Sequence, residues 1–244
     1  MGLVLLGFPA VLEAQEADPC LICHTEPAMF AATGDPDRFV VTPDSQDGSV
    51  HGGFGLSCSS CHPGMEYPHP ERPEVSCSPC HSGLETTFAE SLHGYAKERG
   101  NARAPDCAHC HGSHQILSSS DPRSPTHKVR LPNTCAECHG QAGLLTDELV
   151  RLPQSFQQYA SSVHGQGTAR GVAAAASCAD CHSVHDLKGP ADPESRINPI
   201  NVASTCGQCH PDIQLRYDAS IHGRALRAGV TDSPTCTDCH GEHL

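Results

Sequence analysis

All the cysteines of this 244-residue chain fall into a single pattern. The 16 cysteines form eight copies of Cys-x-x-Cys-His, so no cysteine is left over and a histidine directly follows every pair. Such a pattern restricts the fold strongly, because each copy must present two sulfurs and one imidazole together. We number the copies as sites 1 to 8 in chain order: Cys20/Cys23/His24, Cys58/Cys61/His62, Cys77/Cys80/His81, Cys107/Cys110/His111, Cys135/Cys138/His139, Cys178/Cys181/His182, Cys206/Cys209/His210 and Cys236/Cys239/His240.

Cys-x-x-Cys-His is the attachment signature of c-type haem. Two thiols add to the vinyl groups of one porphyrin, and the adjacent imidazole reaches the iron as its proximal ligand. Structural zinc sites and disulfide loops also use Cys-x-x-Cys, but neither requires histidine after the second cysteine. Given 18 histidines in the chain, a chance histidine at all eight positions has odds on the order of one in a billion. The sequence therefore predicts eight covalent haems.

The composition predicts a fold without a large protein core. Aromatic residues make up 4% of the chain, tryptophan is absent, and there are 22 glycines and 20 prolines. Eight porphyrins leave about thirty residues per ring, so the macrocycles themselves would be most of the buried apolar material. We expect mostly coil with short α-helices packed around a chain of haems, and little or no β-sheet.

A two-site unit is repeated four times. Each unit contains an odd-numbered site, a Ser-x-His-Gly segment, an even-numbered site and a trailing histidine; units 1 to 4 hold sites 1–2, 3–4, 5–6 and 7–8. In units 2 to 4 an aromatic residue lies three positions before the serine, and the trailing histidine follows its attachment histidine by three residues. Unit 1 departs on both points, because it lacks the aromatic and its trailing histidine, His69, follows at seven residues.

These repeats supply one candidate distal ligand for each haem. Of the ten histidines outside the attachment positions, the repeats select eight, and the sharp prediction is bis-histidine coordination throughout; the alternative is that some of them are surface residues. The reserve candidates are His127, which has Asn198 at its place in the later half, and Met65, which follows His62 by three residues. His109 lies between two attachment cysteines and is expected to face solvent. The predicted distal ligands are His51, His69, His93, His114, His164, His185, His222 and His243.

The Ser-x-His-Gly segments are predicted to end short amphipathic helices. The glycine after each histidine suits a left-handed C-terminal cap, which would place the imidazole in the last turn, facing a haem that the aromatic helps to cover. Pro211 suits the first turn of the helix predicted to end near His222. The apolar stripes that indicate these helices are Ile213, Tyr217 and Ile221, and Leu149, Leu152, Phe156, Tyr159 and Val163.

A longer period lies over the units. The distance from the proximal histidine to the Ser-x-His-Gly histidine runs 27, 12, 25 and 12 residues, which predicts two pseudo-repeated tetrahaem halves. The predicted organisation is an apolar N-terminal segment over residues 1–17, a first half over 18–115, a linker loop over 116–134 and a second half over 135–244.

Covalent haem attachment takes place outside the cytoplasm, so we expect an exported protein, either periplasmic or at the cell surface. Residues 2–12 form an apolar run of signal-peptide length but lack a basic region before it. Either the numbering starts inside a longer signal peptide, or the segment is a short membrane-surface anchor, because eleven apolar residues are too few to span a bilayer. The formal charge of -13 makes nucleic acid an unsuitable partner and favours docking to basic patches on redox proteins.

Over nearly its whole length the chain resembles multihaem c-type cytochromes with paired Cys-x-x-Cys-His motifs, Cys-x-x-Cys-His-x-x-His extensions and Ser-x-His-Gly segments. The resemblance implies electron transfer, as a periplasmic or extracellular carrier, a subunit of a membrane quinol-oxidising or terminal reductase complex, or a filament-forming wire. The competing interpretation is a multihaem oxidoreductase in which one open haem acts on a small nitrogen or sulfur compound. Bis-histidine coordination of every iron would exclude it, because no position would be open to substrate.

Overall fold

The computed structural model describes residues 18–65, 67, 69, 75–140 and 154–243. These residues contain short helices joined by turns and coil, with no β-strand among them, which confirms the expected fold class. The α-helices are α1 Leu21–His24, α2 Pro43–Asp47, α3 Val50–Gly53, α4 Cys58–Cys61, α5 Ser78–Ala89, α6 Leu92–Glu98, α7 Cys107–His111, α8 Leu131–His139, α9 Ser155–Ser161, α10 Val163–Ala169, α11 Cys178–His182, α12 Pro199–Gly207, α13 Pro211–Ala219, α14 Ile221–Arg227 and α15 Cys236–His240, with 3-10 helices η1 Pro27–Thr33 and η2 Pro36–Phe39.

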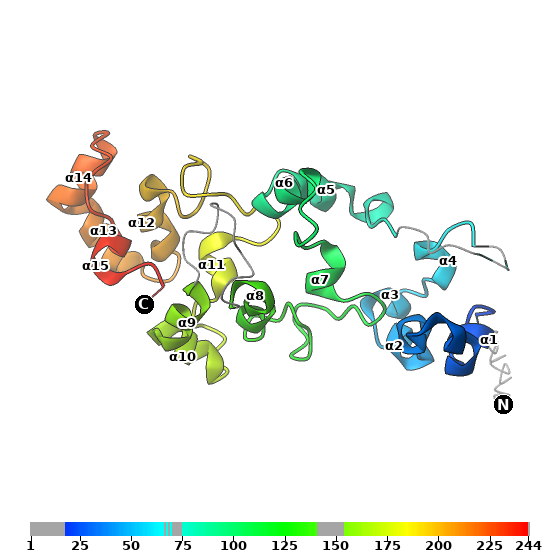
Figure 1. The fold of residues 1–244 in the computed structure, drawn as a ribbon. Helices are drawn as coiled ribbons and strands as arrows, with labels where there is room; N and C mark the ends of the chain where they lie inside the picture. The colour runs from blue at the N-terminus through cyan, green and yellow to red at the C-terminus, as the bar shows by residue number, and fades with distance from the viewer. Residues whose placement is uncertain (1–17, 66, 68, 70–74, 141–153, 244) are drawn as a thin grey trace, which may run out of the picture.

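The molecule is elongated, and its units follow one another along the long axis. Helices α1 to α4 lie at one end and α13 to α15 at the other, with α5 to α12 between them (Figure 1). An arrangement of this kind gives each unit contacts mainly with its neighbours, as in other repeat proteins.

Protein side chains alone build almost no hydrophobic core. Among the described residues, the buried apolar side chains are those of Val202, Ala203 and Leu226. Large apolar side chains are strongly exposed along the molecule; Phe54 is 84% exposed and Val163 80%. This is the outcome that the composition predicts for a chain in which porphyrins supply most of the apolar volume.

The Ser-x-His-Gly segments begin helices and do not end them, so the predicted C-terminal cap is wrong. In each copy the serine is the N-cap of a new helix, the histidine is the second helical residue and the glycine the third. The Ser162 hydroxyl accepts a hydrogen bond from the Gly165 N–H (3.1 Å) and donates one to the Tyr159 carbonyl (2.7 Å). Serine serves this position because its hydroxyl oxygen satisfies an N–H group that has no partner within the helix. Each imidazole therefore lies in the first turn of α3, α6, α10 or α14.

The glycine is required by close approach of two helices, not by a left-handed backbone. A Cβ at Gly165 would lie 1.9 Å from the Tyr159 carbonyl oxygen, and one at Gly94 would lie 2.1 Å from that of Phe88. No L side chain fits such a distance. The left-handed conformation occurs instead at the second glycine of the repeat, where φ is +80° at Gly100, +79° at Gly171 and +89° at Gly229.

The aromatic residue of the segment contributes its backbone first. Its carbonyl oxygen accepts a hydrogen bond from the N–H of the capping serine and lies against the glycine. In unit 1 Gln46 supplies that carbonyl in place of an aromatic residue. In two units the ring adds a further contact, because the Tyr159 hydroxyl donates to the Ala176 carbonyl (2.8 Å) and the Tyr217 hydroxyl to the Pro234 carbonyl (2.9 Å). The tyrosines thereby tie each helix pair to the segment that leads into the next attachment site.

The helix that leads into each segment ends earlier than the apolar stripe suggests. Pro211 does occupy the first turn of α13, as predicted, but α13 ends at Ala219 and His222 belongs to α14. In the other stripe, Leu149 and Leu152 fall outside the described residues.

Sites 4, 6 and 8 share a second local design, which site 2 lacks because its N-cap residue Ser57 makes no side-chain cap hydrogen bond. The residue before the first cysteine caps the attachment helix and exchanges hydrogen bonds with the third helical residue, as in a capping box: Asp106 with His109, Ser177 with Asp180, and Thr235 with Asp238. Backbones of positive φ follow the three attachment histidines, at Gly112, Ser183 and Gly241. They turn the chain so that the trailing histidine leaves in a new direction.

The predicted linker is a series of turns that ends sooner than expected. Backbone hydrogen bonds join every third residue from Ser118 to Arg130, and α8 begins at Leu131, inside the 116–134 stretch. The same ladder recurs from Gly189 to Asn201. The division into halves remains a prediction about the repeats, and the apolar N-terminal segment over residues 1–17 lies outside the described residues.

Segments before and after the linker are joined directly. The Leu92 N–H donates to the Leu187 carbonyl (2.8 Å), and Lys128 of the linker itself pairs with Asp180 of the second half (3.2 Å). The two predicted halves therefore interlock in space.

Candidate haem-binding sites

Fourteen of the predicted axial histidines lie in seven pairs, each formed by one attachment histidine and one candidate distal histidine. No attachment histidine is paired with another, and no histidine is used twice. The ring centroids are 5.9 to 6.3 Å apart in all seven: His24–His69, His51–His81, His62–His114, His93–His139, His111–His185, His164–His210 and His182–His243.

This separation fits an iron between the two rings. A metal–imidazole bond of about 2.0 Å, plus about 1.1 Å from each nitrogen to its ring centre, places two coaxial imidazoles about 6.2 Å apart. Ring contact alone allows centroid distances anywhere from about 4.5 to 7 Å. Here the distance stays within 0.4 Å (6.3 − 5.9) while the angle between ring planes varies from 5° to 55°. An iron atom bound by both rings would keep the distance between their centroids constant while the angle between their planes varies. The paired histidines therefore fit the axial ligands of haem.

The pairs follow one rule of exchange between consecutive units. Each paired Ser-x-His-Gly histidine faces the first site of the next unit: His51 faces site 3, His93 site 5 and His164 site 7. Each trailing histidine of units 2 to 4 faces the second site of the preceding unit: His114 faces site 2, His185 site 4 and His243 site 6. Two histidines therefore cross every junction in opposite directions.

His69 departs from this rule and serves its own unit. Its ring lies 6.0 Å from that of His24 at site 1, which has no preceding unit within the described residues. The His24 ring is fixed in turn, because its Nδ1 lies 2.7 Å from the Phe39 carbonyl oxygen. Such a hydrogen bond orients an imidazole and leaves Nε2 for a metal.

The ring-plane angles divide the pairs into two classes. Pairs that contain a trailing histidine are closer to parallel, at 5°, 29°, 14° and 8° for sites 1, 2, 4 and 6. Pairs that contain a Ser-x-His-Gly histidine are tilted, at 55°, 39° and 42° for sites 3, 5 and 7. The local element that carries the distal histidine thus sets the angle.

The first cysteines of the two sites in each unit lie against each other. Cys20 and Cys58 fall within 4.8 Å together with a carboxylate oxygen of Asp18. In unit 2 the thiols of Cys77 and Cys107 interact, and burial together with Cys107 raises the pKa of Cys77. In unit 3 a hydrogen bond between Cys135 and Cys178 raises the pKa of Cys135. In unit 4 burial, and then Cys236, raises the pKa of Cys206 to about 11.

The second cysteines of the sites divide evenly between exposed and half-buried positions. All 16 attachment cysteines are free thiols in the structure, so no disulfide competes for the sulfurs that two thioether bonds would use. The thioether bonds themselves stay a prediction of the motif. Among the second cysteines, Cys23, Cys61, Cys110 and Cys138 are half-buried, whereas Cys80, Cys181, Cys209 and Cys239 are exposed.

Consecutive units are also close at their attachment cysteines. Burial raises the pKa of Cys77 at site 3, and Cys61 of site 2 contributes to the rise. Burial likewise raises the pKa of Cys181 at site 6, and Cys209 of site 7 contributes to that rise. Burial raises the pKa of Cys110 at site 4, and Cys135 and Cys138 of site 5 raise it further. The spatial order of the sites is therefore their order in the sequence.

Burial keeps several of the paired imidazoles neutral. It lowers the pKa of His93, His111, His139 and His243, and it lowers that of His182 to about 4, where His243 and His139 contribute further. A histidine must be neutral to bind a metal, so these rings are in the ligating form at neutral pH.

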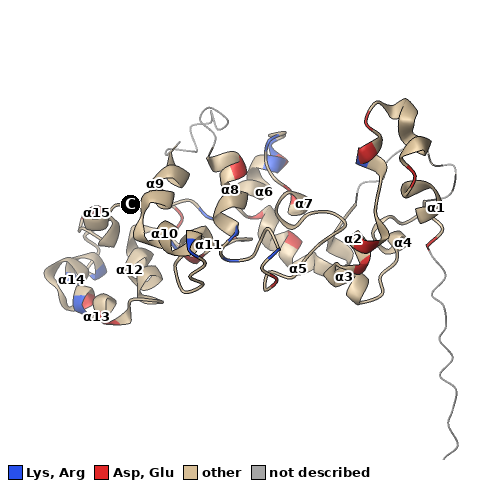
Figure 2. Cartoon of the chain, turned by 90° about the horizontal axis from the view of Figure 1, so that it is seen from below, with Lys and Arg blue, Asp and Glu red and all other residues tan. Residues whose placement is uncertain are grey.

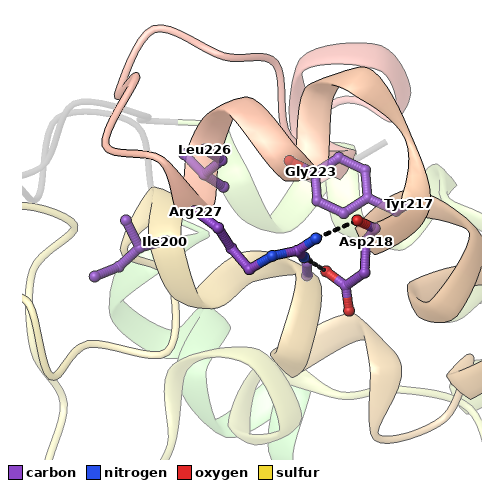
Figure 3. Close-up of a pocket in the computed structure, with 7 residues that line it drawn as sticks. Ile200, Tyr217, Asp218, Gly223, Leu226 and Arg227 are labelled. Carbon is purple, nitrogen blue, oxygen red and sulfur yellow. Dashed lines mark hydrogen bonds and ion pairs between the residues drawn. The ribbon is translucent and has the colours of Figure 1, made fainter.

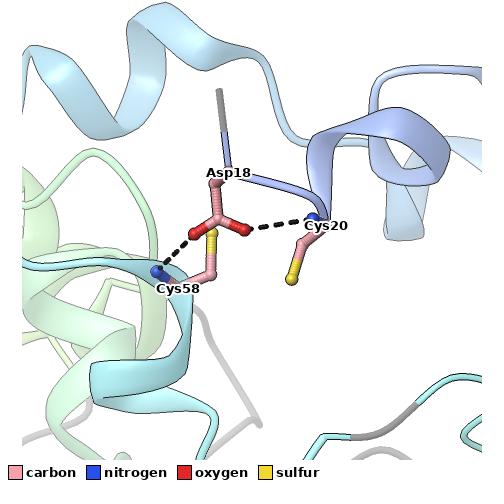
Figure 4. A group of neighbouring side chains, drawn as sticks. All are labelled: Asp18, Cys20 and Cys58. Carbon is pink, nitrogen blue, oxygen red and sulfur yellow. Dashed lines mark hydrogen bonds between the residues drawn. The ribbon is translucent and has the colours of Figure 1, made fainter. Parts of the chain in front are cut away.

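Asp18 is a site residue that the repeats do not reveal. Its carboxylate accepts hydrogen bonds from the backbone N–H of Cys20 (3.0 Å) and that of Cys58 (3.2 Å), as Figure 4 shows. These bonds lower the pKa of Asp18 against the opposing effect of burial. One carboxylate thereby holds the start of sites 1 and 2 together. Only the position of Asp18, two residues before Cys20 and close to the start of α1, could have indicated such a role, because carboxylates are favourable near the N-terminus of a helix.

Two hollows lie in unit 4. The first, about 320 Å³, is lined by the attachment residues Cys209 and His210 of site 7 and by α13 as far as Arg216. The second, about 250 Å³, lies between α12 and the α13–α14 pair, where Arg227 bonds to the Asp218 carboxylate at 2.8 Å and to its carbonyl (Figure 3). No histidine, cysteine or other nucleophilic side chain lines the second hollow apart from the Tyr217 phenol, so it offers no ligand to iron.

The remaining predicted residues are placed as follows. Among the described residues, no ring contact pairs His222, His240 or the reserve candidate His127 with another histidine. The His127 Nδ1 atom is buried and has no hydrogen-bond partner there. His109 is exposed, as expected, and caps α7 through Asp106. Met65 is half-buried, and the ring opposite His62 is that of His114.

One family of known proteins matches part of the chain. Residues 50–140 match the profile of the family described as Cytochrome c3. The match covers sites 2 to 5 and crosses the predicted linker. No curated protein and no solved structure matches the chain. The match supports a multihaem c-type cytochrome with covalent haem and a part in electron transfer. A search of the described residues for a helix long and apolar enough to cross a membrane found none.

Proposed function

We propose that this chain is an eight-haem electron conduit in which sites 1 to 7 are closed by the seven histidine pairs. The observation that carries the proposal is the constant 5.9 to 6.3 Å separation of those pairs, each joining one attachment and one distal histidine. When bound, haem supplies reversible one-electron chemistry, at low potential where both axial ligands are imidazoles and neither is methionine.

The protein's own part in this function is positioning. The capped first turn of α3, α6 or α10 fixes each Ser-x-His-Gly imidazole, and the exchange between units orders the sites in one row. Contacts between first cysteines bring the two sites of a unit together at their attachment edges. Since two imidazoles leave no position open on an iron, the chain can pass electrons at these sites but not bind substrate.

We propose an exported location, periplasmic or at the cell surface, and redox proteins as partners. Covalent haem attachment outside the cytoplasm supports the location. The formal charge of -13 supports docking to basic patches, because charge steers encounter between partners. The charge is uneven: residues 1–115 carry 5 Lys and Arg against 15 Asp and Glu, whereas residues 116–244 carry 10 against 13. A basic partner is therefore expected to meet the α1–α7 part of the molecule.

Voltammetry of the haem-loaded protein on an electrode tests this function. The expected result is reversible reduction and reoxidation of all bound haem, with no added current from nitrite, hydroxylamine or sulfite. A catalytic current with any of these compounds would contradict the conduit.

Such a current would favour the competing function, a multihaem oxidoreductase acting on a small nitrogen or sulfur compound. One observation favours a particular site for this competing function. Site 8 is the attachment site whose histidine, His240, faces no second imidazole among the described residues. Catalysis would therefore be confined to site 8.

A further inference from the structure

Unit 4 carries the two predicted axial histidines that the seven pairs do not include, His222 and His240. By the exchange rule, His222 corresponds to His51, His93 and His164, which each face the first site of the next unit. His240 corresponds to His62, His111 and His182, which each face a trailing histidine from the next unit. Unit 4 thus has one histidine, His222, that would give its imidazole to a neighbouring unit. It also has one attachment site, that of His240, that would receive an imidazole from a neighbouring unit.

These two histidines do not complete each other. No ring contact joins them among the described residues, although both lie in helices that the structure describes. Their counterparts in unit 3, His164 and His182, also face other units, at His210 and His243. The design of the repeat therefore directs both residues outward.

We propose that this face of unit 4 is a junction for a further two-haem unit outside residues 1–244, which gives an imidazole to site 8 and receives His222 at one of its own sites. This inference rests on the proposed function, because it assumes that the seven pairs are axial pairs. The partner is defined by its chemistry: a c-type haem site open on one side, and a histidine free to leave its own unit.

The surface around His222 and His240 suits such a partner. Both histidines are exposed. The Ser233 hydroxyl donates a hydrogen bond to the His222 carbonyl (2.8 Å), which fixes the backbone at His222. On α13 and α14, Leu215 and Ile221, which do not line the hollow at site 7, are 68% and 66% exposed. Exposed apolar area is typical of interaction sites.

The charge of the same helices indicates an acidic partner. Helices α13 and α14 carry Arg216, Arg224 and Arg227 against Asp212 and Asp218, in a chain of net charge -13 (Figure 2). Among the described residues only Arg227 of these arginines forms a salt bridge, with Asp218. Haem propionates are acidic groups that every c-type unit carries at its surface, so a partner haem unit complements the free arginine side chains.

A second copy of the chain could occupy the junction in one way only. Sites 1 to 7 of that copy already have both histidines, so its open residues are again His222 and His240. Two copies would have to meet through unit 4 of each, in a two-fold arrangement where the same patch serves both partners.

The test is the ferric spin state of the purified, haem-loaded chain, measured by electron paramagnetic resonance with the haem count from mass spectrometry and the oligomeric state from light scattering. For a monomer we expect eight haems, seven low-spin and one high-spin, and we expect imidazole, as a stand-in for the incoming side chain, to convert the last. His222→Ala should leave the monomer's spectrum unchanged, whereas the matched variant His164→Ala should add a second high-spin iron at site 7.

The possible outcomes distinguish a failure of the proposed junction from a failure of the proposed function. A monomer with eight low-spin irons, in which His222→Ala creates a high-spin signal, would show that His222 closes site 8 within the chain and would overturn the junction alone. Eight low-spin irons that persist in monomeric His222→Ala would also overturn it. A dimer with eight low-spin irons, which His222→Ala converts to monomers with one high-spin iron, would support the junction with a second copy as occupant. Several high-spin irons in the wild type would instead contradict the proposed function.

Discussion

At the scale of single residues, each histidine's role is set by the residue that it faces and not by its position in the motif. The repeats of the sequence select the candidate ligands among the histidines, but they do not indicate which site each candidate faces. His243 shows why: it lies three residues after the attachment histidine of site 8, yet its ring faces His182 of site 6. The partner depends on how consecutive units pack, and no spacing within one unit encodes that.

Replacing His243 should therefore open site 6 and leave the state of site 8 unchanged. In His243→Ala the His182 ring keeps its haem but loses the opposite imidazole, so one additional high-spin iron is expected, with eight haems still attached. Electron paramagnetic resonance and protein mass measure both quantities. His109→Ala is the matched control, because His109 is exposed and faces no other histidine ring among the described residues. An unchanged low-spin spectrum in His243→Ala would contradict the pair.

The two classes of ring angle should produce two classes of ferric signal. When axial imidazole planes are parallel, both rings mix with the same iron d orbital and split the orbital energies strongly; tilted planes split them less. Sites 1, 4 and 6, at 5° to 14°, should therefore differ from sites 3, 5 and 7, at 39° to 55°. Low-spin spectra of His185→Ala and His164→Ala, which remove one member of each class, should lose different signals. Loss of the same signal from both variants would refute the assignment.

At the scale of elements, the two-helix arrangement of the Ser-x-His-Gly segment is the feature that the sequence indicates least well. A glycine after a histidine is compatible with a left-handed cap, with close packing or with neither, and only the position of the preceding helix decides. In the structure Gly94 has Phe88 and Ala89 backbone atoms where a side chain would be, whereas Gly100 has the left-handed φ. The short helices themselves, the start of α13 at Pro211 and the lack of strands among the described residues were predictable, because proline, glycine and apolar spacing act locally.

Gly94→Ala should therefore disturb site 5. The added methyl group would force α5 and α6 apart, which costs about 1–3 kcal/mol by the usual range for overpacking, and it would move His93 away from His139. The expected readouts are a lower melting temperature and a high-spin signal from site 5. Gly83→Ala, in the interior of α5 with nothing within 4 Å of the new methyl group, is the control. It should be neutral or stabilise the helix by up to about 1 kcal/mol. Equal effects from both variants would show that close approach does not determine the glycine.

At the scale of the whole molecule, the exchange of histidines makes the units dependent on one another. Three junctions are each closed by two histidines that cross in opposite directions, so neither side completes its sites alone. The junction between units 2 and 3 lies where the sequence predicts a linker between two halves, and the pairs His93–His139 and His111–His185 cross it. The spacing predicts a repeat of two tetrahaem halves, but it does not predict the histidine pairs between these two stretches, because those pairs join residues more than 40 positions apart.

Expression of residues 18–115 and 135–244 as separate polypeptides should accordingly leave one open iron at the cut edge of each. Site 4 would lose His185 and site 5 would lose His93, while sites 1 to 3, 6 and 7 would keep both imidazoles. Imidazole or cyanide binding, followed by absorption spectroscopy, should therefore detect site 4 in the first fragment and site 5, in addition to site 8, in the second. A first fragment that is fully low-spin would show that the half is self-sufficient.

The most direct test of the account is the position of the irons in the haem-loaded protein, determined from anomalous X-ray scattering at the iron edge. The account predicts eight irons in one row in the order of sites 1 to 8, with seven of them between the histidine pairs named above. An iron bound by His127 or Met65, or a spatial order that differs from the sequence order, would contradict it.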